Sequence, residues 1–224
     1  MNPPIYSAVR PVGVLKPQFQ HNQVSAGKVF ADSLDVKGTA FWLKTEKVLI
    51  TCAHVISGLV DTPLELAGLL VVGLGHAGAY NRATIAAVDY THDLAVLQLV
   101  ADQAIVETEA ASGLVVANSY PEVGIRVGYA GFPLGIQLLA SSPHPTYAVG
   151  VIGTQMRKTG TRKNVQISGP VVGGYSGSPI VREDNPTEVV GVVSNSPSAE
   201  AGQASIFMAT SWEHLLPLAK LASS

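Results

Sequence analysis

Short apolar runs, most of them rich in β-branched residues, recur along the whole chain between glycines, prolines and polar residues. Runs of this length that are bounded by turn residues are typical of β-strands rather than helices. The pattern predicts strands over residues 12–15, 38–43, 48–52, 69–72, 94–100, 125–129, 147–152, 165–167, 179–181, 189–193 and 205–208. Many short strands at regular spacing favour a sandwich or a barrel, so the predicted fold class is all-β.

Helical periodicity is convincing only at the C-terminus. There Ser211 is a candidate N-cap, and Pro217 is expected to kink or divide the helix because proline has no N–H to donate. The apolar positions that follow a 3.6-residue period are Trp212, Leu215, Leu216, Ala219 and Leu221.

The polar segment 107–121 is the expected seam between two halves of the chain, since it is made of small and polar residues and leads into a proline. It overlaps a weaker helix candidate at 102–112, which is also compatible with loop. The predicted domains are residues 1–115 and 116–224, and 224 residues suit one domain or two small halves that share a core.

Composition excludes several classes of protein. Apolar residues make up 47% of the chain and charged residues 13%, which excludes a disordered chain. Lys and Arg number 14 against 16 Asp and Glu, which argues against a nucleic-acid partner because phosphate binding needs a positive excess. The apolar runs end well short of the roughly 18 residues of a membrane span, so no membrane partner is expected.

The N-terminus and the cysteine content bear on localisation. The first residues, MNPPIY, lack the basic stretch and apolar run of a secretory signal. The single cysteine, Cys52, excludes a disulfide framework and a multi-cysteine zinc site. We therefore expect a cytoplasmic protein, and the sequence indicates nothing about its oligomeric state.

Three polar residues stand beside apolar runs where they can act together. His54 follows one run, Asp93 opens another, and Ser176 lies among glycines in GGYSGSP (173–179). A serine hydroxyl becomes a nucleophile only with a base in hydrogen-bond reach. A histidine supplies that base, and a buried carboxylate fixes its tautomer and stabilises the imidazolium. We therefore predict Ser176 as the nucleophile, His54 as the base and Asp93 as its partner.

The glycines around Ser176 allow the backbone to turn so that N–H groups point at a developing oxyanion. The predicted donors are the backbone N–H groups of Gly174, Tyr175 and Ser176.

Taken in order, these segments resemble those of the trypsin/chymotrypsin-fold serine proteases, closest to the bacterial HtrA-like peptidase domains, and we expect no PDZ module. The histidine follows Thr-Cys-Ala where the family has Thr-Ala-Ala or a close variant, and the aspartate opens DLAVL. The serine lies in GYSGSP where the family has G-x-S-G-G/S-P. The separations are 39 residues from His54 to Asp93 and 83 from Asp93 to Ser176, and the resemblance covers roughly residues 54–193.

The resemblance implies two packed antiparallel six-stranded β-barrels with a C-terminal helix. The first barrel would carry His54 and Asp93, the second would carry Ser176, and the cleft between them would be the active site. The implied function is that of a serine endopeptidase that acts on polypeptides through an acyl-enzyme, with no cofactor and no metal.

One departure from the animal digestive enzymes concerns activation. Those enzymes are activated when a new N-terminus pairs with an Asp just before the serine. Here that position is Tyr175, and no Ile/Val-Gly-Gly follows a basic residue near the start. The switch is therefore expected to be absent, and the site is either pre-formed or organised by loop movement.

Substrate preference follows from the resemblance by exclusion. The family's primary pocket would lie between the segment before Ser176 and the strand around 192–196. Residues 167–175 contain no Asp or Glu, and Val193 offers no cationic group, so we expect cleavage after a small or medium apolar residue. An extended peptide would add to this backbone as a strand. The expected substrate-binding residues are Pro170, Val193, Ser194, Asn195 and Ser196.

Neighbouring residues compete for these roles. Asp89 is the rival of Asp93, which is preferred because it adjoins the apolar run that would bury it. His92 is expected to be exposed or one contact removed from the site. Cys52 stands two residues from His54 and invites a Cys/His nucleophile interpretation, but a free cysteine is more often a small buried hydrophobe.

Other motifs have simpler explanations. GLGHAG at 73–78 fits a dinucleotide loop, but a strand-like run follows where that site needs a helix, so a hairpin is predicted. The basic residues around Thr-Gly-Thr at 159–161 predict a solvated hairpin tip. No metal is predicted, because the remaining histidines considered have no ligand spacing: His21, His76, His144 and His214.

Two alternative functions compete with the serine endopeptidase. An α/β-hydrolase would use Ser176, Asp184 and His214, which leaves only 38 residues for the strands and helices of that fold, and it is rejected. The rival is a catalytically silent or partner-activated protease-fold module that binds peptides.

Overall fold

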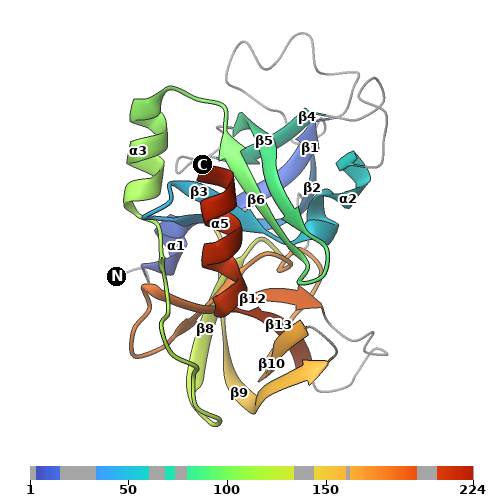
Figure 1. Ribbon diagram of the computed structural model, residues 1–224, viewed down its shortest axis with the longest axis vertical. Helices are drawn as coiled ribbons and strands as arrows, with labels where there is room; N and C mark the ends of the chain where they lie inside the picture. The colour runs from blue at the N-terminus through green and yellow to red at the C-terminus, as the bar shows by residue number, and fades with distance from the viewer. Residues whose placement is uncertain are drawn as a thin grey trace.

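The computed structural model describes residues 4–15, 34–60, 69–73, 80–133, 144–159, 162–195 and 206–223. They form two β-barrels, one above the other in Figure 1, with the C-terminal helix lying across the first. The predicted pair of six-stranded antiparallel barrels with a C-terminal helix is therefore confirmed.

The first barrel closes in the order β1-β2-β3-β6-β5-β4, with β1 and β4 pairing to complete the ring. Large apolar side chains such as Phe41, Leu49 and Ile50 are fully buried and fill it. Its strands are β1 (Val9–Leu15), β2 (Leu34–Leu43), β3 (Val48–Thr51), β4 (Leu69–Gly73), β5 (Tyr80–Asp89) and β6 (Leu94–Leu99).

The second barrel closes in the order β11-β8-β9-β10-β13-β12, with β11 and β12 pairing to complete the ring. Tyr129, Ile167 and Phe207 are fully buried in its core. Its strands are β8 (Arg126–Gly131), β9 (Thr146–Thr159), β10 (Arg162–Ser168), β11 (Pro179–Arg182), β12 (Glu188–Asn195) and β13 (Ile206–Ser211), and the short β7 (Val115–Val116) adds to β12 in parallel.

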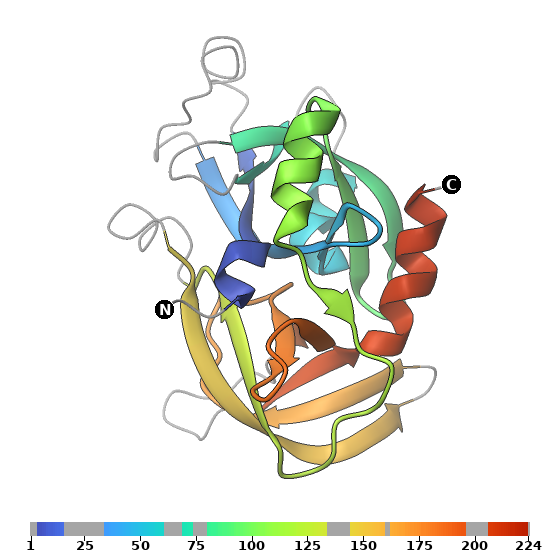
Figure 2. The ribbon, with the colours of Figure 1, turned by 90° about the vertical axis from the view of Figure 1, so that its left-hand side faces the viewer.

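The chain between the barrels bonds to both of them. Leu114 donates its N–H to the Trp42 carbonyl of the first barrel at 2.9 Å, and Ala117 donates to the Val189 carbonyl of the second at 3.0 Å. In Figure 2 this connection runs from α3 (Gln103–Ala111) down to β7 and β8. The predicted domain boundary between residues 115 and 116 falls inside it and stays a prediction.

Two helices correct local predictions. The strand expected over 48–52 ends at Thr51, and α2 (Ala53–Val60) begins at once, so His54 lies in the first turn of a helix. Residues 102–112, whose pattern is compatible with either helix or loop, contain helix α3. Its Glu109 forms a buried ion pair with Arg10 of β1 at 2.7 Å, which fixes a helix whose own apolar pattern is weak.

The C-terminal helix also differs in detail. Ser211 occupies the N-cap position of a 3₁₀ turn, η4 (Trp212–His214), but makes no side-chain capping bond. Pro217 is the third residue of α5 (Leu215–Ser223), where backbone N–H groups have no acceptor within the helix, so it does not interrupt the helix. α5 packs back on the first barrel, where Gln98 donates to the Ala222 carbonyl at 2.8 Å.

Two predicted hairpins are confirmed by strand pairing. The glycine-rich segment joins β4 to β5, and the basic segment joins β9 to β10, in both cases antiparallel. Residues 74–79 and 160–161 themselves lie outside the described part of the chain. The remaining short helix is α1 (Ile5–Ala8). No helix among the described residues is long and apolar enough to cross a bilayer.

Candidate active site

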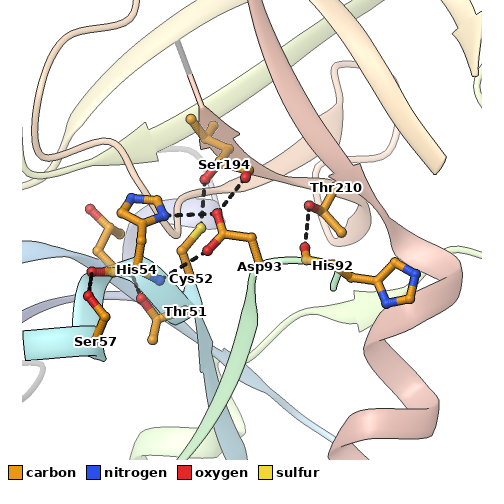
Figure 3. Close-up of polar contacts among 10 residues, drawn as sticks. Thr51, Cys52, His54, Ser57, His92, Asp93, Ser194 and Thr210 are labelled. Atoms are coloured by element: carbon orange, nitrogen blue, oxygen red, sulfur yellow. Dashed lines mark hydrogen bonds and ion pairs between the residues drawn. The ribbon is translucent and has the colours of Figure 1, made fainter. Parts of the chain in front are cut away.

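His54 and Asp93 form a two-point contact in the first barrel. His54 is the second residue of α2, where backbone N–H groups lack a partner within the helix. Asp93 accepts that N–H on Oδ1 at 3.0 Å, and its Oδ2 lies 2.8 Å from the ring Nδ1 (Figure 3). Two contacts to one carboxylate fix the ring and leave Nε2 on its other edge. The His54 side chain is 47% exposed.

Asp93 accepts hydrogen bonds from residues of both barrels. It lies in the turn between β5 and β6 with φ +56°, a left-handed conformation that Asp and Asn adopt more readily than most residues. Ser194 of β12 donates its hydroxyl to Asp93 Oδ2 at 2.5 Å. Burial alone would raise the pKa of Asp93, but hydrogen bonds from the His54 ring, Ser194 and the His54 backbone outweigh it and lower the pKa below its usual value. At neutral pH Asp93 is therefore a buried carboxylate.

Cys52 lies beside His54 and Asp93, and the three residues together could offer ligands to a metal ion. Cys52 is fully buried and donates its thiol to the Val193 carbonyl at 3.1 Å. Ligand atoms of Cys52, His54 and Asp93 lie within 4.8 Å of one another. Each residue already has protein partners for those atoms, so the group fits a hydrogen-bonded network without a metal. The absence of a metal and of a cofactor stays a prediction, and the burial of Cys52 favours its interpretation as a small core residue.

Ser176 is tied to the same place through its backbone. Its carbonyl accepts the Thr39 N–H from β2 at 2.9 Å, and the following N–H, of Gly177, donates to the Val193 carbonyl at 2.8 Å. That carbonyl also accepts the Cys52 thiol, two positions before the histidine. The serine segment and the histidine segment therefore meet at one backbone oxygen. Ser176 is half-buried, and its hydroxyl makes no hydrogen bond with any described residue.

Two glycines beside Ser176 are required by both conformation and space. Gly174 has φ +100°, and a Cβ there would lie 2.2 Å from the Phe132 carbonyl oxygen. Gly177 has φ +86°, and a Cβ there would lie 2.0 Å from the Thr39 carbonyl oxygen. The serine loop can approach Phe132, just beyond the end of β8, and Thr39 of the first barrel this closely only with glycine at both positions.

The backbone corrects one predicted oxyanion donor. The Tyr175 N–H donates to the Val172 carbonyl at 3.3 Å, so it is already engaged. The N–H groups of Gly174 and Ser176 are not engaged by any described residue. The prediction of three donors therefore narrows to these two.

The Tyr175 side chain anchors the serine loop in the core of the second barrel. It is buried and meets the Tyr129 ring edge to face, with centroids 5.5 Å apart, while the Tyr129 hydroxyl donates to the Pro170 carbonyl at 2.6 Å. Burial raises the pKa of Tyr175 to about 12, so the ring is neutral. A packed aromatic ring thus occupies the position where the animal digestive enzymes have an aspartate.

Comparison with known families decides what this architecture is. Residues 38–192 match the family model of the trypsin-like peptidase domain. The chain belongs to the trypsin-like peptidase domain family. This assignment makes it a serine-protease-type hydrolase domain, in agreement with the resemblance carried by the three motifs.

One relative and two solved structures are similar to this chain. "Uncharacterized protein y4bJ" of Sinorhizobium fredii (strain NBRC 101917 / NGR234) is 30% identical over 167 residues, which cover 75% of this chain but only 23% of that relative. The Rv3671c protease from M. tuberculosis in its active form has a TM-score of 0.66 at 20% identity, covering 97% of this chain and 82% of its own. The HtrA-type protease AlgW with a decapeptide has a TM-score of 0.68 at 18% identity, and the match covers 97% of this chain and 64% of the AlgW chain. At these identities the two structures show the fold.

The residues predicted to bind substrate in this peptidase domain have different surroundings. Val193 is buried, and both its N–H and its carbonyl are bonded within the protein. The Ser194 hydroxyl is committed to Asp93, a role that no motif signalled. Pro170 is exposed, and Asn195 ends β12 opposite Met208. Ser196 lies outside the described residues.

Asp89, the predicted rival of Asp93, contacts a different histidine. Its Oδ2 lies 2.5 Å from His92 Nδ1, and the His92 ring stacks on His214 with centroids 3.7 Å apart. Figure 3 shows the His92 ring pointing away from Asp93, while the His92 carbonyl accepts the Thr210 hydroxyl. This second pair is adjacent to the site but turned away from it.

Proposed function

We propose that this peptidase domain is a serine endopeptidase that cuts polypeptides through an acyl-enzyme, with Ser176 as nucleophile, His54 as general base and Asp93 as the partner that orients His54. The observation that carries the proposal is the two-point contact of His54 with Asp93, beside the backbone oxygen that anchors the serine loop. An ionised Asp93 accepts a hydrogen bond from the Nδ1–H, which leaves Nε2 as the basic edge of the ring.

The proposed reaction has two halves. Ser176 Oγ bonds to the carbonyl carbon of the scissile peptide, and its proton passes to His54 Nε2. The N–H groups of Gly174 and Ser176 receive the oxyanion, each worth roughly 3–4 kcal/mol in comparable sites. The C–N bond then breaks as the proton moves from His54 to the leaving amine. Water attacks the ester, its proton passes to His54, and the C–Oγ bond breaks as that proton returns to Ser176.

Specificity for a small or medium apolar residue before the cut is part of the proposal. The segment before the nucleophile carries no charged side chain between residues 169 and 175, and its Val172 is 49% exposed. A library of peptides that differ only at this position tests it. Ala and Val should be cut faster than Arg and Glu, and preference for a charged residue would contradict it.

A fluorophosphonate probe tests the nucleophile directly. The probe forms an Oγ–P bond and releases fluoride, with the serine proton taken up by the base. Wild-type protein should be labelled, and Ser176→Ala should not. Ser178→Ala is the matched control, because it removes a fully buried serine two positions away and should leave labelling unchanged. Folded wild-type protein that resists labelling, or labelling that survives Ser176→Ala, would reject the proposal in favour of a silent peptide-binding module.

A further inference from the structure

Thr39 of β2 is fully buried, yet its polar atoms connect the first barrel to the serine loop. Its N–H donates to the Ser176 carbonyl at 2.9 Å, and its hydroxyl donates to the Gly174 carbonyl at 2.8 Å. The same hydroxyl accepts the Phe132 N–H at 3.1 Å, just beyond the end of β8. One side chain therefore joins β2, the end of β8 and the loop that carries the nucleophile.

These bonds lie on either side of the peptide that carries the Ser176 N–H. The hydroxyl of Thr39 holds the preceding peptide group, through the Gly174 carbonyl, and its N–H holds the following one, through the Ser176 carbonyl. Glycine adopts left- and right-handed conformations with similar ease, so Gly174 does not fix the direction of its own peptide groups. An external bond to its carbonyl is what restricts them.

We propose that Thr39 is a positioning residue for the oxyanion site. Its hydroxyl holds the Gly174 carbonyl so that the N–H groups of Gly174 and Ser176 point together into the cleft. This inference rests on the proposed function. Without the hydroxyl, the Gly174 carbonyl and the Phe132 N–H would each lose a buried partner, and the loop would relax until other groups satisfied them.

Three variants separate the hydroxyl from the rest of the residue. Thr39→Val keeps the shape and the backbone N–H but removes the hydroxyl, and Thr39→Ser restores it. Thr51→Val is the matched control, because Thr51 is also fully buried and donates one hydroxyl bond, to the Thr39 carbonyl at 2.7 Å, without a bond to Gly174 or Phe132.

The expected result is a loss in kcat without a loss in substrate binding. Direct loss of one oxyanion donor costs about 10²–10³ in kcat, so misplacing the donors through Thr39→Val should cost about 10- to 100-fold. KM should stay within about threefold, since the bond acts on the transition state. The rate of fluorophosphonate labelling should fall in step with kcat, while Thr39→Ser and Thr51→Val stay within about threefold of wild type.

Thermal unfolding of each variant shows whether it is folded, and Thr39→Ala serves as a second hydroxyl-free variant with room for a water at the Gly174 carbonyl. A folded hydroxyl-free variant with unchanged kcat overturns the positioning role alone. Equal losses in Thr39→Val and Thr51→Val, or no recovery in Thr39→Ser, do the same. Wild-type protein that is not labelled at Ser176 overturns the proposed function together with this inference.

Discussion

Two histidine–aspartate pairs meet at the turn between β5 and β6, and they use the same contacts. In each pair one carboxylate oxygen accepts the histidine backbone N–H and the other faces its Nδ1. These distances are 3.0 and 2.8 Å for His54 with Asp93, and 3.1 and 2.5 Å for His92 with Asp89. The contacts alone do not distinguish a catalytic candidate from a structural pair.

The surroundings of the rings distinguish them. The His54 side chain is 47% exposed, whereas that of His92 is 18% exposed and its face is covered by His214. Asp93 also receives a hydroxyl from the second barrel, while Asp89 lies only three residues from its histidine. A general base needs a free ring edge at the cleft as well as a carboxylate behind it. Only the pair that joins distant segments combines the two.

The largest expected effect separates the two histidines. His54→Ala removes the proposed base and should lower kcat by up to about 10⁶-fold, as loss of the base does in another serine protease. His92→Ala, the matched variant, should lower kcat by less than about tenfold. Peptide cleavage is measured on proteins with the same circular dichroism and melting temperature. Comparable losses in the two variants would remove the distinction between the pairs.

The two aspartates should differ nearly as much. Asp93→Asn keeps the size and tolerates the left-handed backbone, but it favours the wrong imidazole tautomer and should lower kcat by about 10⁴-fold. Asp89→Asn should leave kcat within about tenfold of wild type. The assay is peptide cleavage at pH 8, and a strong loss in the Asp89 variant would show that the second pair supports catalysis.

A smaller effect is expected from the hydroxyls that support each pair. Ser194→Ala removes the bond to Asp93 and should lower kcat by about tenfold, close to the lower bound for a hydrogen bond to a charged group. Thr210→Val removes the hydroxyl bond to the His92 carbonyl and should change kcat less than Ser194→Ala does. If the Thr210 variant loses as much kcat as the Ser194 variant, then support of Asp93 matters no more for catalysis than support of the second pair, which contradicts the comparison.

The smallest effect is on acid stability. Burial opposes ionisation of both aspartates, but hydrogen bonds to their histidines outweigh it and lower the pKa of Asp89 and of Asp93. A lowered pKa stabilises the fold above the unfolded value of about 3.9, and that stabilisation is lost as pH falls through the folded value. Either Asn variant should therefore be less stable than wild type at pH 7.

Urea unfolding at several pH values measures this difference in the free energy of unfolding. The gap between wild type and each Asn variant should close as pH falls through the lowered pKa values of the folded protein. It should be larger for Asp93, whose side chain is 11% exposed, than for Asp89 at 28%. A gap that does not change with pH would contradict the assignment of the ionised forms.

The sequence was sufficient for the fold class because its signals are local. Short β-branched runs and turn residues predicted the strands, and the order of three motifs predicted the family. The sequence does not decide helix α3, because the ion pair of Glu109 with Arg10 that holds it joins residues 99 apart, and no local periodicity reveals that contact. His54 was expected after a strand, and only the observed end of β3 at Thr51 shows that a helix begins first.

The supporting hydroxyls could not be predicted for the same physical reason. Ser194 and Thr39 are ordinary polar residues in predicted strands, and their partners are set by how the two barrels pack. The preference for Asp93 over Asp89 rested on a local signal, the adjoining apolar run. The stacking of His92 on His214 joins residues far apart in the chain and left no trace in the pattern.

The hydrogen-bonded connection between the barrels has a consequence for motion. Leu114 and Ala117 tie one continuous segment to a strand of each barrel, and the Thr39 N–H bonds across to the Ser176 carbonyl, so swinging the halves apart would break this main-chain bond between them. The amide protons of Leu114 and Ala117 should exchange slowly with solvent. The groups that would perform the chemistry are thus held by hydrogen bonds that run both within and between the two barrels.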